Sequence, residues 1–308
     1  MDNIITIANL VKTYGGTKAV DGISLSVARS EVFGILGPNG AGKTTTLEMV
    51  EGLRKPDDGT ITIDNVPVWP NPKKIKNLIG VQLQTTALLD HLSVRELVRL
   101  FGSFYGIRIS NKAADALLDE VALTEKAKAM VHQLSGGQQQ RLSIALALVN
   151  DPKVIFLDEP TTGLDPQARR KLWSAVERIN TEGKTVVLTT HYMEEAEVLC
   201  GRIAIMDNGR IIALDTPDGL IRSLGADAKV TFTAKSALDE GRLAQLPEVS
   251  EVGRDDASYM FYTGDIQASI TGLLRFVEAE RVRVENLNVT GANLEDVFLH
   301  MTGRGLRE

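Results

Sequence analysis

The sequence predicts an α/β protein with a core of the nucleotide-binding type, and three observations support this. Short β-rich runs alternate with helical patterns as far as residue 215. The runs VIFLD and VVLTT are nearly all apolar, which is what a sheet covered on both faces requires. A glycine-rich segment, GPNGAGKTT at residues 37–45, directly follows the apolar run VFGIL and opens a helical pattern.

The composition allows a large core and argues against some functions. Of 308 residues, 43% are hydrophobic and 24% charged, and at this length two domains are more probable than one. A net charge of -6 argues against nucleic acid as a partner. Cys200 is the only cysteine, so an intramolecular disulfide is impossible and a reducing compartment is expected. The longest apolar runs are too short to span a membrane, so we expect a soluble chain.

The first predicted domain covers residues 1–222 and the second covers residues 223–308, with a helical subdomain at about 86–150. Helical patterns of the first domain begin at Lys43, lie between Ser93 and Met130, begin again at Pro166 and follow His191. Its predicted strands are IITIANL, ISLSV, VFGILG, ITID, IGVQLQ, VIFLDE, TVVLTT and RIAIMD.

The second domain is predicted to be a small α+β unit. After a short helix and polar linker in TPDGLIRSLGADAK, its patterns follow the order β-α-β-β-α-β and end in a helix, LEDVFLHM. This order suggests a split βαβ sandwich. Residues 229–308 hold 9 Lys and Arg against 13 Asp and Glu, so this domain is also acidic.

The segment GPNGAGKTT matches the phosphate-binding pattern G-x-x-x-x-G-K-[ST] in its expected context of strand, loop and helix. Its glycines let successive N–H groups point at phosphate, and the helix start adds positive potential. Lys43 would contact the β and γ phosphates of ATP, and the Thr44 hydroxyl would hold Mg²⁺. The alternative is a glycine-rich turn with a solvated lysine. The expected nucleotide-binding residues are Gly37, Pro38, Asn39, Gly40, Ala41, Gly42, Lys43, Thr44 and Thr45.

Two acids follow the apolar run VIFL, and a histidine follows TVVLTT. Asp158 is placed to order the Mg²⁺ shell, and Glu159 to orient or deprotonate an attacking water. Both carboxylates emerge where open parallel sheets bind their ligands, although solvated strand-end acids are the alternative. His191 can reach a γ-phosphate from its strand end, or it can cap the helix that follows.

The octet LSGGQQQR, residues 134–141, lacks any base, nucleophile or metal ligand. Residues 1 to about 225 resemble the nucleotide-binding domain of ABC transporters, which implies a P-loop NTPase core with a helical subdomain. GPNGAGKTT matches the Walker A element, LSGGQQQR the ABC signature, VIFLDEP the Walker B element, TGLDP the D-loop and His191 the switch histidine. The resemblance implies that Tyr14 stacks on adenine and that Gln84 links Mg²⁺ and water to a membrane partner. Alternation places Gln82 on the same face as Gln84, and position at the strand end favours Gln84.

The resemblance also gives the octet a role. Ser135 is predicted to cap a helix, and the glycines after it allow close backbone approach by phosphate. In the ABC family this segment closes over ATP held by the partner subunit, which implies a dimer, most simply a homodimer with two sites. Asp165 would couple the two sites and would also cap the helix from Pro166. The residues expected to act on the partner's nucleotide are Ser135, Gly136, Gly137 and Gln138.

The single ATPase domain and the ending LEDVFLHMTGR resemble the ATPase subunits of ABC-2 type drug and antibiotic-resistance exporters. This resemblance implies an ATPase, peripheral on the inner face of the cell membrane, that moves a separate permease. The helical region from Ser93 to Met130, in which FGSFYG would expose aromatic side chains, is the candidate docking surface for the permease, although it could equally pack internally. The second domain would support dimerisation or stability, or alternatively bind a regulatory ligand. The alternative functions are a soluble ABC ATPase acting on ribosomes or DNA, and an importer subunit.

Overall fold

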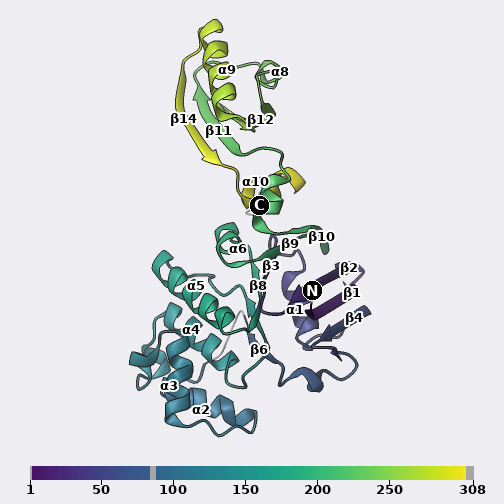
Figure 1. Ribbon diagram of the computed structural model, residues 1–308, viewed down its shortest axis with the longest axis vertical. Helices are drawn as coiled ribbons and strands as arrows, with labels where there is room; N and C mark the ends of the chain where they lie inside the picture. The colour runs from purple at the N-terminus through teal and green to yellow at the C-terminus, as the bar shows by residue number, and fades with distance from the viewer. Residues whose placement is uncertain (1, 84–87, 303–308) are drawn as a thin grey trace. The chain divides into compact units, whose positions relative to one another are not determined.

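A computed structural model of the chain describes residues 2–83 and 88–302. The chain divides into two units between Thr216 and Pro217, and Figure 1 shows the elements of both. The division lies before the short helix α7 (Pro217–Arg222), which therefore belongs to the second unit. No helix in the described ranges is both long enough and apolar enough to cross a membrane.

The first unit is organised around a six-stranded sheet with the order β10-β9-β3-β8-β7-β6. All neighbouring strands are parallel except β9 and β10. Every residue of β3, β7 and β8 is buried, as expected for strands covered on both faces: β3 and β7 are almost wholly apolar, and β8 combines three apolar residues with three threonines. The strands are β3 (Val32–Leu36), β6 (Ile79–Gln82), β7 (Val154–Asp158), β8 (Thr185–Thr190), β9 (Arg202–Asp207) and β10 (Arg210–Asp215).

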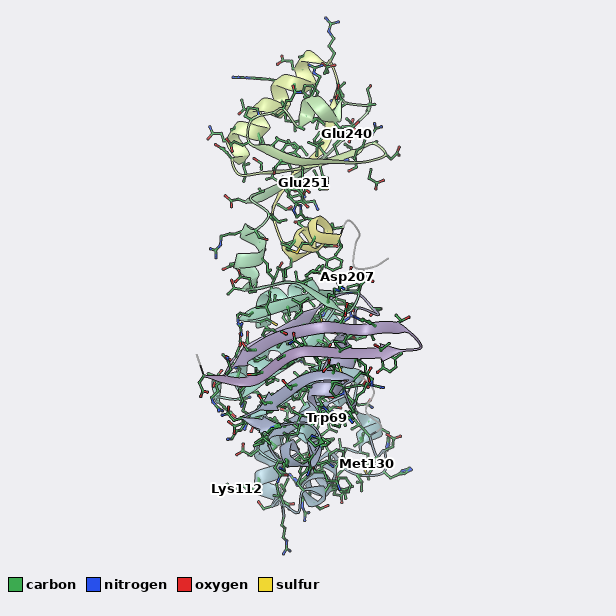
Figure 2. The ribbon with its side chains drawn as sticks, turned by 90° about the vertical axis from the view of Figure 1, so that its right-hand side faces the viewer. Trp69, Lys112, Met130, Asp207, Glu240 and Glu251 are labelled. Atoms are coloured by element: carbon green, nitrogen blue, oxygen red, sulfur yellow. The ribbon has the colours of Figure 1, made fainter. Side chains whose placement is uncertain are left out.

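A second, antiparallel sheet has the order β2-β1-β4-β5. Its apolar face shares a core with the large sheet and with α1, and this core includes Ile7, Phe33, Leu47 and Phe156. Trp69, labelled in Figure 2, follows this sheet and donates its indole N–H to the Met49 carbonyl at 3.2 Å. The strands are β1 (Asn3–Tyr14), β2 (Thr17–Ala28), β4 (Asp58–Ile63) and β5 (Val66–Pro67).

Helices complete the first unit, and α2, α3 and α4 gather together in the lower left of Figure 1. Arg141 of α4 is buried and donates from Nη1 to the carbonyls of Val121 and Ala122, both at 2.7 Å, which ties α4 to the end of α3. The α-helices are α1 (Lys43–Val50), α2 (Val94–Phe104), α3 (Asn111–Glu120), α4 (Gly136–Ala147), α5 (Pro166–Thr181) and α6 (Met193–Leu199). Short 3-10 turns occupy Pro72–Ile75, Thr124–Lys126 and Val131–Gln133.

Cys200 lies at the end of α6 and is buried and unpaired with other sulfur. It packs against Gly34 of β3, where an added Cβ would stand only 2.7 Å from the Cys200 Sγ. The glycine therefore makes room for the thiol. Burial raises the pKa of Cys200 well above its usual range.

The second unit has a four-stranded antiparallel sheet with the order β12-β13-β11-β14. Its chain order is β-α-β-β-α-β followed by a helix, which confirms the predicted split βαβ arrangement. Asp296 of the last helix is buried and accepts from Lys229 Nζ at 2.7 Å and Tyr262 Oη at 2.8 Å, which fixes that helix to the sheet. The elements are β11 (Ala228–Ala234), α8 (Glu240–Leu243), β12 (Val249–Asp255), β13 (Ser258–Thr263), α9 (Ile266–Ala279), β14 (Val284–Gly291) and α10 (Leu294–Thr302).

Candidate nucleotide-binding site

The loop between β3 and α1 has a backbone that only glycine allows at two positions. Gly42, the N-cap of α1, has φ 99° and ψ 6°, and an added Cβ would stand 2.3 Å from the Ala19 carbonyl oxygen. At Gly37, a Cβ would stand 2.3 Å from the Met206 carbonyl oxygen. Since Gly42 has no side chain to cap α1, the first N–H groups of this helix can serve an anionic ligand.

Lys43 lies inside this loop and is only 4% exposed. Its Nζ donates to the carbonyls of Gly37 at 2.8 Å and Pro38 at 3.1 Å, and lies 3.4 Å from Glu159 Oε1. Burial lowers the pKa of Lys43, while the charge of Glu159 opposes that shift. The loop's own carbonyls thus fix the ammonium within the turn, where it faces the strand that carries the two acids.

Asp158 ends β7 and is bonded to hydroxyls from two other elements. Its Oδ1 accepts from Thr189 Oγ1 of β8 at 2.5 Å and from Thr44 Oγ1 of α1 at 3.3 Å. Burial raises the pKa of Asp158, and the two hydroxyls oppose this. A carboxylate beside a threonine hydroxyl provides the hard oxygen donors that Mg²⁺ prefers, so these residues fit that ion.

Glu159 follows in a left-handed conformation, with φ 46°. Thr189 holds this turn, because its carbonyl and its hydroxyl accept from the Glu159 N–H at 3.2 Å and 3.0 Å. The carboxylate Oε2 accepts from Thr162 Oγ1 at 3.2 Å and lies 3.2 Å from His191 Nδ1. The structure therefore brings together Lys43, Glu159 and His191, which are far apart in the sequence. A base, an ammonium and an imidazole at one point can serve hydrolysis of a phosphate ester.

The signature segment forms an exposed helix start on α4. Ser135 is its N-cap, as expected, and forms a capping box with Gln138: Gln138 N donates to Ser135 Oγ at 3.4 Å, and Ser135 N donates to Gln138 Oε1 at 2.9 Å. Gly136 is exposed and an added Cβ would meet nothing within 4 Å. At Gly137, however, a Cβ would stand 2.8 Å from Ala168 Cβ of α5, so this glycine serves packing within the chain.

The remaining predicted residues lie apart from this cluster or outside the described part of the chain. Asp165 caps α5, accepting from Ala168 N at 2.8 Å, and is exposed. Tyr14 ends β1 and is 41% exposed, with the Arg54 guanidinium 5.4 Å from its ring centroid. Gln84 lies outside the described residues. Gln82 is buried and donates from Nε2 to the Leu83 carbonyl at 2.7 Å.

Sequence reasoning missed Thr189 and Thr162, which hold the two acids. The signal for Thr189 was its polar side chain near the end of the run TVVLTT, and in the β7–β8 register it lies directly opposite Asp158. Thr162 carried no such signal, because threonines are common in turns.

Comparison with known proteins gives consistent results. A family model described as "ABC transporter" matches residues 20–162. The chain is 38% identical to the linearmycin resistance ATP-binding protein LnrL of Bacillus subtilis (strain 168), covering 97% of this chain and 98% of that protein. It is 42% identical to the Nod factor export ATP-binding protein I of Paraburkholderia xenovorans (strain LB400), covering 96% of each. Among solved structures, the dimeric post-hydrolysis state of the ATP-binding cassette MJ0796 bound to ADP and Pi matches with TM-score 0.63 and 32% identity, covering 69% of this chain and 98% of that one.

Proposed function

The chain belongs to the ABC transporter family and is an ATPase of that family, and from this premise we propose that it powers an ABC-2 type exporter of drugs or other amphipathic substrates. One relative is named for linearmycin resistance and another for Nod factor export. These names support export, and they do not favour an importer or an ATPase acting on ribosomes or DNA.

The observation that carries the proposal is the meeting of Lys43, Asp158, Glu159 and His191 at the carboxyl ends of β3, β7 and β8. The glycine loop and Lys43 bind the β and γ phosphates of ATP, with Tyr14 against the adenine. Thr44 and Asp158, with Gln84, would hold Mg²⁺, which neutralises charge on the phosphates when bound.

Hydrolysis then uses residues of this chain. Glu159 orients a water and takes its proton as the water oxygen attacks the γ-phosphorus, and the bond to ADP breaks. Lys43 and His191 bind the oxygens of the transferred phosphoryl group, where negative charge is concentrated. Thr162 and Thr189 position the carboxylate and the backbone of Glu159.

A second copy of the chain completes each site. Ser135 and Gly136 are exposed at the start of α4, so they can approach ATP held by another molecule. Gly137 and Gln138 would act indirectly: Gly137 packs against α5, and Gln138 completes the capping box that stabilises the first turn of α4. Asp165 is exposed nearby on the cap of α5 and would couple the two sites. ATP can favour the closed dimer only if its affinity for the closed dimer is higher than its affinity for the open one. Contacts from the second chain to the nucleotide would supply this difference in affinity.

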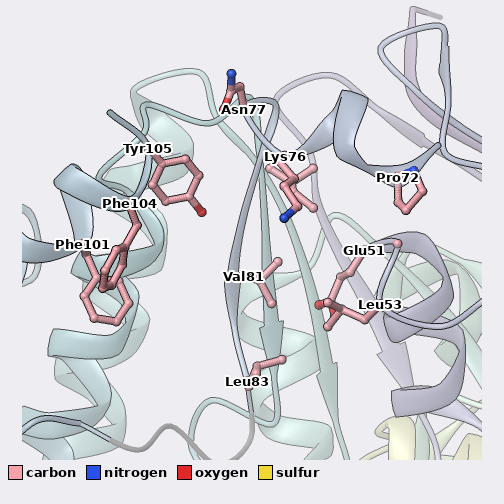
Figure 3. A pocket seen from close by; sticks show the side chains of 12 residues that line it. Glu51, Leu53, Pro72, Lys76, Asn77, Val81, Leu83, Phe101, Phe104 and Tyr105 are labelled. Atoms are coloured by element: carbon pink, nitrogen blue, oxygen red, sulfur yellow. The ribbon is translucent and has the colours of Figure 1, made fainter. Parts of the chain in front are cut away.

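The permease would dock on a cavity of about 570 Å³ in the first unit. Phe101, Phe104 and Tyr105 form one wall, and Leu53 lies on the opposite wall, as Figure 3 shows. Phe104 is 68% exposed, so part of FGSFYG is available to a partner. Docking here would hold the chain on the inner face of the cell membrane. The second unit would support dimerisation or stability.

The test is reconstitution of the chain with the membrane protein from the neighbouring reading frame, which should contain about six apolar spans. We expect ATP-dependent movement of an amphipathic drug out of the cytoplasmic side and ATPase activity that the drug stimulates. Glu159→Gln should lose both. Movement in the opposite direction, or a neighbouring frame without membrane spans, would contradict the exporter assignment.

A further inference from the structure

A buried carboxyl faces the cavity proposed for permease docking. Glu51 directly follows α1, is only 5% exposed, and lines the cavity with Leu53 and Val81. Figure 3 shows it on the wall opposite Phe101, Phe104 and Tyr105, with Val81 between. A polar side chain in so apolar a place is unusual, because burying a carboxyl group without partners is costly.

Among the residues that the structure describes, no cation pairs with Glu51. Its Oε1 is buried without a hydrogen-bond partner, and it takes part in no ion pair within residues 2–83 and 88–302. Glu48, three residues earlier on α1, differs in this respect because it pairs with Arg54 at 2.5 Å. Lys76 also lines the cavity, but it is exposed and forms no ion pair with Glu51 in the described structure. Burial, together with the smaller effects of the negative charges of Asp158 and Glu48, raises the pKa of Glu51 to about 8.

The wall across the cavity suits a cation with an apolar stem. The rings of Phe101 and Phe104 lie with their centroids 5.6 Å apart, and Tyr105 adjoins them. Aromatic faces attract ammonium and guanidinium groups, and they cover the methylene groups of lysine and arginine. A cation entering between this wall and Glu51 would meet aromatic faces on one side and, on the other, a carboxyl group that loses its proton as the cation approaches, because a nearby positive charge lowers its pKa.

We propose that Glu51 is the anchor for one arginine or lysine side chain of the permease segment that docks in this cavity. The inference rests on the proposed function, since the occupant is the permease. It goes beyond that function by saying how the cavity would select its occupant. The apolar walls would accept many segments, whereas the carboxyl group of Glu51 would favour a segment with a cation opposite it.

The test measures binding of the full chain to the solubilised permease from the neighbouring reading frame. Glu51→Gln keeps the shape but removes the group that can ionise beside the cation, and we expect it to weaken binding about 30-fold or more, as for other buried charge pairs that lose one member. Glu48→Gln is the matched control, because Glu48 already has a cation, and should bind within about threefold of wild type. The Tm of isolated Glu51→Gln should stay close to wild type, since Glu51 Oε1 has no hydrogen-bond partner and the side chain has no ion pair in the described part of the chain. A large loss of Tm would instead assign Glu51 a structural role and overturn the proposal.

A charge exchange identifies the partner. Glu51→Arg should abolish binding, and replacing one arginine or lysine in the permease's cytoplasmic segments by glutamate should restore it. If none of these replacements restores binding, the proposed ion pair between Glu51 and the permease is wrong. If Phe104→Ala weakens binding while Glu51→Gln does not, the permease docks here without a cation, and only this inference fails. If neither variant weakens binding, the docking surface itself is wrong, and that part of the proposed function fails as well.

Discussion

Two helix starts in the first unit, those of α1 and α4, differ in where their partners lie. At α1, Lys43 is buried and its Nζ is held by the carbonyls of Gly37 and Pro38 and by nearby Glu159. At α4, Ser135 and Gly136 are exposed, and the capping box satisfies only the helix itself. One chain thus assembles the first group of residues alone, whereas the second group is exposed, as its proposed action on another molecule requires. The burial of Lys43 and the exposure of Ser135 and Gly136 therefore distinguish the two helix starts more clearly than residue type does.

The largest effect is expected on the rate of ATP hydrolysis when the site around α1 loses its proposed general base. Glu159→Gln should lower ATP turnover by about 10²- to 10⁴-fold, because proton transfer to a positioned base supplies that much. ATP binding should persist, since the glycine loop and Lys43 are unchanged. Phosphate release and equilibrium binding of labelled ATP measure the two properties. Glu194→Gln, an exposed carboxylate on α6, is the control. Hydrolysis close to the wild-type rate would remove Glu159 from the role.

The next effect concerns the stability of the α1 start. Gly42→Ala should lower the free energy of unfolding by about 3 kcal/mol or more, because it combines a left-handed backbone with a clash against the Ala19 carbonyl. Gly40→Ala is the control, since φ is 82° there but an added Cβ would meet nothing within 4 Å. It should cost about 1–2 kcal/mol. Urea denaturation measures both, and equal losses would contradict the close packing at Gly42.

At α4, Ser135→Arg should leave ATP binding by the isolated chain intact and weaken ATP-dependent dimerisation about tenfold or more, because it removes a hydroxyl that would bind a charged phosphate and puts a bulky side chain in its place. Ser110→Arg is the control, because Ser110 is also an exposed N-cap, on α3, and loses the same capping bond. Sedimentation with and without ATP distinguishes them. A Ser135→Arg chain that dimerises like Ser110→Arg would refute the action of α4 on a second molecule.

The smallest effects are expected from the two glycines of the signature segment, whose replacement by alanine should change the free energy of unfolding to different extents. Gly137→Ala should destabilise the fold by about 1–2 kcal/mol through the contact with Ala168, and Gly136→Ala should change stability by about 0.5 kcal/mol or less. Gly136→Ala should nevertheless reduce ATP-dependent dimerisation if close backbone approach matters there. The reverse order of stabilities would mean that Gly136, and not Gly137, packs against α5.

Much of this architecture could be predicted from sequence because local pattern and topology agree. The apolar runs ending in Asp158 and Thr190 became neighbouring parallel strands, so their end residues met. The order of elements in the second unit followed from alternation and turn residues. Contacts between distant segments could not be read in this way. The packing of Gly137 on Ala168 depends on how two helices cross, and the cavity beside Glu51 depends on where α2 places its aromatic side chains. Gln84 falls outside the described residues, so its role stays a prediction.

The burial of Cys200 behind Gly34 has a practical consequence for labelling. Thiol reagents attack the thiolate, and burial both shields this sulfur and raises its pKa. Since the sequence has one cysteine, a second one introduced at an exposed position away from the nucleotide-binding residues, such as Lys112 on α3, would be the only thiol to react. Spin labels or fluorophores placed there could report how the distance between the α3 helices of two molecules changes as ATP is added, with the native cysteine left in place.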